Sequence, residues 1–223
     1  LVPQDPNDEP ASVLLERIRA EKKAKLGKKY VDSYIYKGDD NCYYEKVGET
    51  VTNISNEIPF DLPENWSYSR LETMITLLSG RDLEPNQYNS QRAGIPYITG
   101  ASNIEHGSLI INRWTTNSAT ISRKGDLLIT CKGTVGTMAL NNVGDIHIAR
   151  QIMAINADGV CLNYIRLFLE SHVRVLQNKA KSFIPGISRQ DLLKAIMPIP
   201  PFNEQLRIVE QYKTIYKQLK DED

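Results

Sequence analysis

Apolar residues recur with the spacing of an α-helix in three separate parts of the chain. The first predicts a helix over residues 11–26, because its apolar positions fall at i, i+3, i+4 and i+7 and Gly27 offers a stop. These apolar positions are Ala11, Leu14, Leu15 and Ile18. The second part predicts a helix over 162–177 with one apolar face, and the third a helix from Asn203 to the end of the chain.

Between residues 66 and 200 the apolar runs are short, and glycine, asparagine and aspartate separate them. Such runs predict β-strands joined by turns. The predicted strands cover residues 66–70, 95–99, 108–111, 125–130, 137–140 and 146–155. Short helices are predicted at 71–78, before Gly80, and at 189–194, where Ser188 is a good N-cap. This order of elements predicts an α+β fold with a strand-rich core and later helices.

Composition divides the chain into four zones. Residues 1–29 hold an extended start rich in proline and aspartate, followed by the first helix. Residues 30–65 are polar, and we expect a linker with one or two short strands. Residues 66–200 form the folded body, and residues 201–223 begin the last helix after two adjacent prolines.

The last predicted helix has an apolar seam that its own domain does not obviously cover. The seam of two heptads consists of Ile208, Tyr212, Ile215 and Leu219, widened by Leu206, Val209 and Tyr216. Steps of four, three and four residues are typical of a helix that packs on another helix. We expect its partner to be either the 11–26 helix or a helix of another chain.

Charge is distributed unevenly, although the net charge of the 223 residues is zero. Residues 1–65 carry 9 basic and 13 acidic side chains, and residues 201–223 carry 4 and 5. Residues 66–200 carry 14 basic and 9 acidic side chains, a net charge of +5. The folded body is therefore the part suited to a polyanion.

Cysteines and apolar runs indicate a cytoplasmic protein without a metal or a membrane span. Cys42, Cys131 and Cys161 are scattered, and neither a C-x-x-C pair nor a histidine at zinc-ligand spacing accompanies them. Scattered thiols fit a reducing cytoplasm. No run approaches the roughly 18 apolar residues of a membrane-spanning helix.

The sequence motifs that would indicate catalysis or cofactor binding are incomplete in this chain. The glycine-rich run 131–137 lacks the order of a phosphate-binding P-loop, which leaves a tight turn or a loop that approaches a DNA phosphate. Pro201-Phe202 lacks the preceding polar residue that an amino-methyltransferase needs, and Glu21-Lys22-Lys23 has no paired upstream aspartate for a nuclease. We expect no catalytic residue and no cofactor.

Polar and basic residues in loops of the body are the candidate site. Arginine, asparagine and glutamine make bidentate contacts with base edges, whereas lysine, serine, threonine and backbone N–H groups bind phosphates. The candidate DNA-binding residues are Ser79, Gly80, Arg81, Arg92, Thr99, Ser102, Asn103, Lys132, Gly133, Thr134, Arg150, Gln151, Lys181 and Ser182.

Several segments resemble the specificity subunits of type I restriction-modification enzymes, in that family's order. The last helix begins with IPPFNEQLRIVEQ (199–211), and its Pro-Pro-x-x-Glu-Gln signature is fairly specific. The matching pieces of the body are LPENW-x(3)-RL (62–71), IPYITGASNIEHGSLI (95–110), KGDLLITCKGTVGTMAL (124–140) and IARQIMAIN (148–156). The start, LVPQDPNDEPASVLLERIRAEK (1–22), is similar to the segment after the central conserved helix.

The resemblance implies that residues 1–29 end the central conserved region, 66–200 form one target recognition domain of two, and 201–223 begin the distal conserved helix. It implies sequence-specific recognition of double-stranded DNA, directing adenine methylation by modification subunits and, through the complex, cleavage by a restriction subunit. The alternative is a helical assembly adaptor for the modification subunit with only nonspecific DNA affinity.

Overall fold

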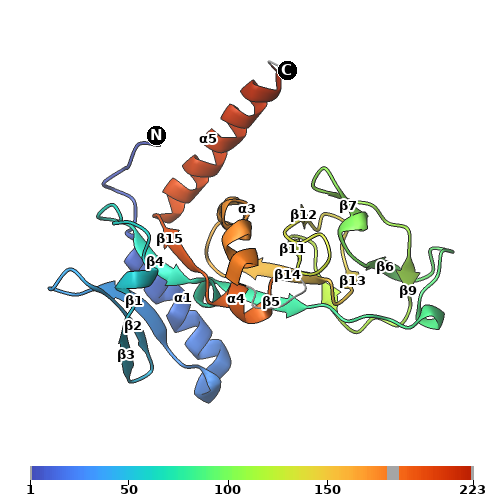
Figure 1. Ribbon diagram of the computed structural model, residues 1–223, viewed down its shortest axis with the longest axis horizontal. Helices are drawn as coiled ribbons and strands as arrows, with labels where there is room; N and C mark the ends of the chain where they lie inside the picture. The colour runs from blue at the N-terminus through green and yellow to red at the C-terminus, as the bar shows by residue number, and fades with distance from the viewer. Residues whose placement is uncertain (1, 180–185, 222–223) are drawn as a thin grey trace. The chain divides into compact units, whose positions relative to one another are not determined.

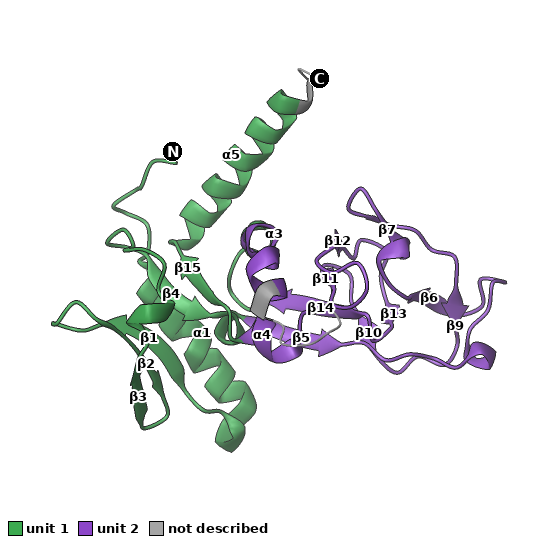
Figure 2. Ribbon diagram, viewed as in Figure 1, with its two compact units in different colours: residues 1–74, 158–167, 194–223 green, residues 75–157, 168–193 purple. Residues whose placement is uncertain are grey.

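The computed structural model describes residues 2–179 and 186–221, and its mixture of helices and strands confirms the predicted α+β class (Figure 1). The chain divides into two compact units (Figure 2). Unit 1 holds residues 1–74, 158–167 and 194–223, and unit 2 holds residues 75–157 and 168–193. Both ends of the predicted 66–200 body thus belong to unit 1. None of the described helices is long and apolar enough to cross a membrane.

Helix α1 (Ala11–Leu26) in unit 1 has the predicted ends. Its four predicted apolar positions are all buried. At its C-terminus the Gly27 N–H donates to the carbonyl oxygen of Lys23, with a φ of +56° that glycine adopts without a steric penalty. The periodicity of the sequence therefore located both this helix and its buried face.

Residues 30–65 hold more structure than the expected linker. Strands β1 (Ser33–Lys37), β2 (Tyr43–Val47) and β3 (Thr50–Asn53) form an antiparallel sheet in that order. The 3₁₀ helices η1 (Gly27–Lys29) and η2 (Ser55–Glu57) flank it. One or two strands were too few, because tyrosine and threonine rather than aliphatic residues carry this sheet.

A second sheet in unit 1 joins segments far apart in the sequence. Strand β4 (Ser67–Arg70) pairs antiparallel with β15 (Ile196–Ile199). Helix α2 (Leu71–Met74) follows β4, and helix α5 (Phe202–Asp221) follows β15. The pairing brings the start of α5 to the unit that contains α1.

The Arg70 guanidinium is a buried charge at the centre of unit 1. Its Nε and Nη2 donate to the two carboxylate oxygens of Glu45 at 3.1 and 2.8 Å, and Nη1 donates to Glu57 at 2.9 Å and to the Lys194 carbonyl at 2.7 Å. Burial opposes ionisation of Glu45, but the Arg70 hydrogen bonds and charge outweigh it and hold the pKa of Glu45 below its ordinary value. One side chain therefore ties β4 to β2, η2 and the segment before β15.

Unit 2 is built on two four-stranded sheets. The first has the order β12-β11-β14-β5, all antiparallel, from strands β5 (Ile75–Ser79), β11 (Leu127–Thr130), β12 (Met138–Leu140) and β14 (Ile152–Ala157). The second has the order β10-β13-β6-β9, from strands β6 (Ile95–Ile98), β9 (Trp114–Thr115), β10 (Ile121–Ser122) and β13 (Ile146–Ile148). One buried cluster draws on both sheets: Ile98, Leu128, Ile146, Ile148, Ile152 and Ala154.

Smaller elements complete the chain. They are η3 (Pro85–Gln87), η4 (Ala101–Asn103), the hairpin β7 (Ile104–Glu105) and β8 (Ser108–Leu109), α3 (Leu162–Lys179) and α4 (Arg189–Leu193). Helices α3 and α4 confirm the predicted elements at 162–177 and 189–194 to within two residues at each end. The division into units passes through α3, whose first turns belong to unit 1.

Two sequence-based assignments in the body need correction. The predicted 71–78 helix ends at Met74, and β5 begins at the next residue because it pairs along its length with β14. The predicted 146–155 strand is two strands, β13 and β14, separated by residues 149–151. In both places pairing with distant strands decided the structure, and the local pattern of apolar residues did not reveal it.

Replacing Arg70 with methionine leaves the buried Glu45 carboxylate without its counter-charge. We expect the free energy of unfolding to fall by about 3–5 kcal/mol, measured by urea denaturation. The control is Glu210→Gln, which removes the exposed Lys213–Glu210 pair and is expected to cost less than about 0.5 kcal/mol. Equal losses for the two variants would contradict the role given to Arg70.

Candidate functional site

The ends of three strands of the first sheet in unit 2 lie next to one another. Strand β11 ends at Thr130, which pairs with Ile152 at the start of β14. Strand β5 ends at Ser79, which pairs with Met153, one residue further along β14. Because neighbouring strands run in opposite directions, the residues after Thr130 and after Ser79 lie beside those before Ile152.

The second sheet of unit 2 ends at the same place. Strands β6 and β13 are parallel, and their last residues, Ile98 and Ile148, are paired. Residues 149–151 connect β13 directly to β14, so this short link joins the edges of both sheets. Four predicted DNA-contacting segments therefore gather here: 79–81, 99–103, 132–134 and the link itself.

Main-chain hydrogen bonds fix the link in place. Two of them hold its own residues, and two hold the residues that follow β5 to the strands beside it. The four N–H to O bonds join Ala149 to Ile98, Cys131 to Gln151, Gly80 to Ile152 and Arg81 to Ile148, at 2.8–3.0 Å. The positions of the loops thus depend on backbone groups, whatever side chains they carry.

Gly80 approaches the link too closely for any side chain. A Cβ atom at this position would lie 2.0 Å from the Ala149 carbonyl oxygen, well inside van der Waals contact. This packing requirement alone explains why residue 80 is a glycine. A contact between Gly80 and DNA stays a prediction.

Five of the predicted residues present exposed side chains around the link: Arg81, Lys132, Thr134, Arg150 and Gln151. Gly133 is also exposed and has a φ of +72°. The Gln151 Oε1 atom lies 2.5 Å from where a Cβ on Gly100 would stand and 3.9 Å from where one on Gly133 would stand. Gln151 therefore lies beside both loops, and the glycine at position 100 leaves room for it.

Arg150 is held by a carboxylate that the sequence analysis did not select. One carboxylate oxygen of Asp82 accepts a hydrogen bond from the Arg150 backbone N–H at 3.0 Å, and the other forms an ion pair with the Arg150 Nε at 2.7 Å. Both side chains are exposed. Sequence reasoning missed Asp82 because its partner lies 68 residues away.

His147 is a second residue that the sequence analysis left without a role. It is fully buried, and its Nδ1 accepts the backbone N–H groups of Ala119 and Thr120 at 3.2 and 3.4 Å. Its Nε2 lies 2.8 Å from the Arg81 carbonyl oxygen. Because Nδ1 is an acceptor here, Nε2 carries the proton and donates to Arg81. His147 thereby supports the main chain at Arg81.

Asn103 supports its loop from within. Its side chain is fully buried, with Oδ1 accepting the Thr99 N–H and hydroxyl at 2.9 Å and Nδ2 donating to the Ile110 carbonyl at 2.9 Å. The Asn103 side chain is therefore buried with its hydrogen bonds satisfied and supports the loop in this structure, and its contact with DNA stays a prediction. The neighbouring Ser102 is exposed, and Thr99 is half-buried.

The remaining predicted residues lie apart or are used elsewhere. Arg92 precedes β6, at the opposite end of this strand from Thr99, and its Cζ lies 5.7 Å from the centre of the Trp114 ring. The Ser79 hydroxyl accepts a 3.3 Å hydrogen bond from Arg189. Lys181 and Ser182 lie outside the described residues.

Helix α5 presents most of its predicted seam to solvent. Val209 is buried and Ile208 is half-buried, but every side chain from 210 to 219 is exposed. The seam residues Leu206, Tyr212, Ile215 and Leu219 are among the exposed large apolar side chains. Beyond Val209 neither α1 nor any other described element covers these side chains, and a partner helix for the seam stays a prediction.

Polar contacts anchor the first turns of α5. The Trp66 Nε1 donates to Glu204 at 3.1 Å, and the Gln205 side chain accepts the Cys161 N–H at 2.9 Å. Burial raises the pKa of Glu204. The anchored start and the exposed remainder make α5 a projecting arm of unit 1.

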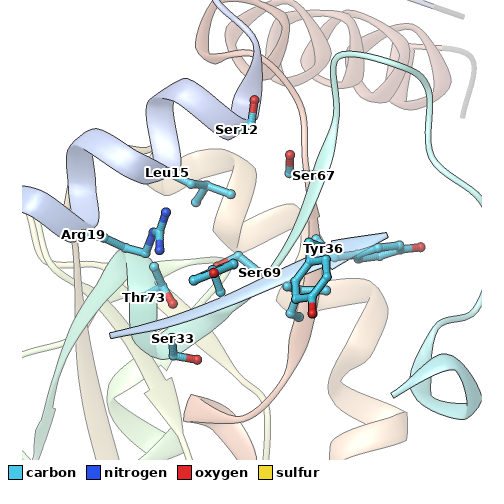
Figure 3. Close-up of a pocket in the computed structure, with 11 residues that line it drawn as sticks. Ser12, Leu15, Arg19, Ser33, Tyr36, Ser67, Ser69 and Thr73 are labelled. Carbon is cyan, nitrogen blue, oxygen red and sulfur yellow. The ribbon is translucent and has the colours of Figure 1, made fainter. Parts of the chain in front are cut away.

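A hollow of about 180 Å³ opens in unit 1 among α1, β1 and β4 (Figure 3). Arg19 is the cation of its lining; its Nη1 lies 3.1 Å from an Asp32 oxygen and its Cζ 4.5 Å from the centre of the Tyr34 ring. The other polar groups are mostly hydroxyls, from Ser12, Ser33, Ser67, Ser69 and Thr73. The hollow thus offers neutralised and uncharged groups, unlike the cationic loops of unit 2.

The loops of unit 2 therefore have the chemistry of a binding surface: exposed arginine, lysine, threonine and glutamine on a rigid strand edge. Among the described residues, no group of three or more histidine, cysteine, aspartate or glutamate side chains is placed to hold a metal.

The sequence of residues 63–222 matches the type I restriction modification DNA specificity domain, and the chain belongs to that family. It is 27% identical over 232 residues to the type I restriction enzyme EcoAI specificity subunit of Escherichia coli, covering 95% of this chain and 36% of the relative. The EcoEI specificity subunit of Escherichia coli is also 27% identical, over 96% of this chain and 36% of the relative. The chain thus spans about a third of the length of these relatives, which are both specificity subunits.

Solved structures share the fold. The HsdS subunit of Thermoanaerobacter tengcongensis is similar with a TM-score of 0.66 at 20% identity, over 94% of this chain and 49% of that one. A chain from a type I R-M system solved for its assembly and conformational transition has a TM-score of 0.68 at 21% identity, over 94% and 50%. These structures confirm the fold, and the match of residues 63–222 to the specificity domain confirms the family resemblance of the sequence.

Replacing Asn103 with alanine removes the internal hydrogen bonds of its loop. We expect the free energy of unfolding to fall by about 1–3 kcal/mol, because the groups around Asn103 lose their partners in a buried place. Ser102→Ala, at the exposed neighbouring position, is the control and is expected to change little. Urea denaturation of both variants measures this, and an unchanged Asn103→Ala protein would contradict the supporting role.

Proposed function

We propose that this chain recognises a specific sequence in double-stranded DNA, as half of a type I restriction-modification specificity subunit. The observation that carries the proposal is the gathering of Arg81, Lys132 and Arg150 on one rigid strand edge, in a chain that belongs to a family of DNA specificity domains. Recognition of a base pair needs donors held in fixed positions, and the backbone hydrogen bonds around 149–151 hold these loops.

The side chains around the link divide by the contacts their chemistry allows. Arg81 and Arg150 suit guanine, which presents two acceptors in the major groove, and Gln151 suits adenine. Lys132 and Thr134 suit phosphates, as do the N–H groups of an exposed glycine loop. We infer that the first group selects the sequence and that the second places the DNA.

The proposal assigns the chemistry to other subunits. Bound to its site, this chain would direct modification subunits to methylate adenine and, through the complex, a restriction subunit to cleave. In this arrangement its residues position DNA and partners, and it needs no cofactor of its own. We also propose that residues 66–200 act as the target recognition domain, although both ends of this range belong to unit 1. Residues 30–65 would link it to the conserved segment 1–29, the segment 201–223 would follow it, and the protein would act in the cytoplasm.

Substitution at the link distinguishes base contacts from phosphate contacts. We expect Arg81→Ala and Arg150→Ala to weaken binding to the recognised duplex by about 1–3 kcal/mol and to relax the preference for one base pair each. Lys132→Ala should weaken binding to all sequences about equally and lower the salt dependence by about one phosphate contact. Fluorescence anisotropy over a range of salt concentrations measures both. The same loss profile for all three variants would contradict this division.

A second candidate function, a helical assembly adaptor with only nonspecific DNA affinity, is favoured by the exposed apolar seam of α5. Such a seam costs free energy in water and suggests a partner helix. Assembly through α5 is compatible with sequence recognition, but an affinity for DNA that is only nonspecific is not. The two candidates separate experimentally, because the adaptor does not require the loops of unit 2.

Placing aspartate at Ile215 and Leu219 should disrupt assembly with partner subunits while leaving the fold unchanged, since both side chains are exposed. Lys217→Asp is the matched control: it changes the net charge by the same amount on the opposite face of α5. Co-purification of the partner subunits measures assembly, and thermal unfolding verifies the fold. If the control disrupts assembly equally, charge and not the apolar seam is responsible.

A further inference from the structure

The Asp82 carboxylate contacts Arg150 at two places, unlike the carboxylate of an ordinary surface ion pair. One carboxylate oxygen accepts the Arg150 backbone N–H at 3.0 Å, and the other lies 2.7 Å from its Nε. The carboxylate therefore holds both ends of the same residue, which restricts the rotamers open to a long and exposed side chain.

The two residues are also fixed relative to each other through the backbone. Arg81, which precedes Asp82, donates its N–H to Ile148 at 2.9 Å, and Ala149, which precedes Arg150, donates to Ile98 at 2.9 Å. His147 additionally binds the Arg81 carbonyl at 2.8 Å. The carboxylate thus acts from a rigid position at the end of β5.

The contact with Nε leaves the outer end of the guanidinium available. Arginine has five N–H donors, and four of them are on the terminal nitrogens Nη1 and Nη2. Among residues 2–179 and 186–221, none accepts a hydrogen bond from these two nitrogens. A side chain held at Nε presents them together, in the fork that matches the O6 and N7 acceptors of guanine.

We propose that Asp82 is a specificity-determining positioning residue, which holds Arg150 by its Nε so that the two terminal nitrogens read one guanine. This inference rests on the proposed DNA recognition. It also has a consequence that a contact residue would not have: because Asp82 is negative, it opposes attraction to phosphates in general. Asp82 therefore weakens the electrostatic attraction to DNA of any sequence and raises discrimination at one base pair.

The chain supplies a matched control for this charge. Arg123 forms an ion pair with Asp145, which precedes β13, whereas Arg150 follows the same strand. Both pairs are exposed and belong to unit 2. Asp82→Asn and Asp145→Asn change the net charge equally, but only the first removes the support of Arg150. An amide has a single acceptor oxygen and does not hold both N–H groups of Arg150.

The test uses the protein in its natural complex, purified from the host cells. A pool of duplexes with a randomised central segment first yields the recognised sequence. Duplexes with each single base-pair substitution, and an unrelated duplex, then give the preference at every position for the wild type, Asp82→Asn and Asp145→Asn. Asp82→Ala is measured beside them, and thermal unfolding verifies that each variant folds.

We expect Asp82→Asn and Asp82→Ala to reduce the preference at one G·C pair by about tenfold and to bind the unrelated duplex more tightly. Asp145→Asn should keep every preference. The inference is overturned if the Asp82 variants keep the preference, or if they lose affinity equally for all duplexes, as a purely structural residue would. If the wild type selects no sequence from the pool, the proposed function itself is wrong.

Discussion

Backbone hydrogen bonds around residues 149–151 are the constraint on which the rest of unit 2 depends. They attach the ends of β5, β6 and β11 to the link between β13 and β14, so that both sheets share one edge. The close approach of Gly80 to Ala149 leaves no room for a side chain at position 80. Without this junction, the loops would stand at the ends of independent sheets, and their side chains would not face one ligand.

Unit 1 depends on a different kind of interaction. Its strands are short and rich in polar residues, and a buried arginine connects them: Arg70 satisfies Glu45, Glu57 and a main-chain carbonyl together. A buried ion pair is costly to desolvate, but the loss of one partner is costlier. Unit 1 therefore combines this polar network with buried apolar residues such as those of α1, whereas the cluster that joins the two sheets of unit 2 is entirely aliphatic.

Sequence reasoning succeeded where local periodicity decides structure. Helix α1, α3 and the start of α5 follow from apolar spacing and from glycine and proline stops. It failed where distant partners decide: Ile75 begins a strand because β14 lies beside it, and the tyrosine-rich strands of unit 1 lack an apolar signal. In the site, asparagine at 103 looked suited to adenine, yet only its burial reveals that it supports the loop. Asp82 and His147 gave no signal either, since their partners are 68 and 66 residues away.

Because main-chain groups hold the junction together, the fold of this surface and its recognition of a ligand depend on different groups. Glycine at 80 is required by geometry, but the bonds at Arg81, Ala149 and Cys131 involve N–H groups that nearly every amino acid provides. The side chains at 81, 132 and 150 are consequently replaceable without repacking the sheets. A scaffold of this kind is evolvable: new target preferences are accessible through single substitutions, each nearly neutral for stability, so recognition can diversify while the fold persists.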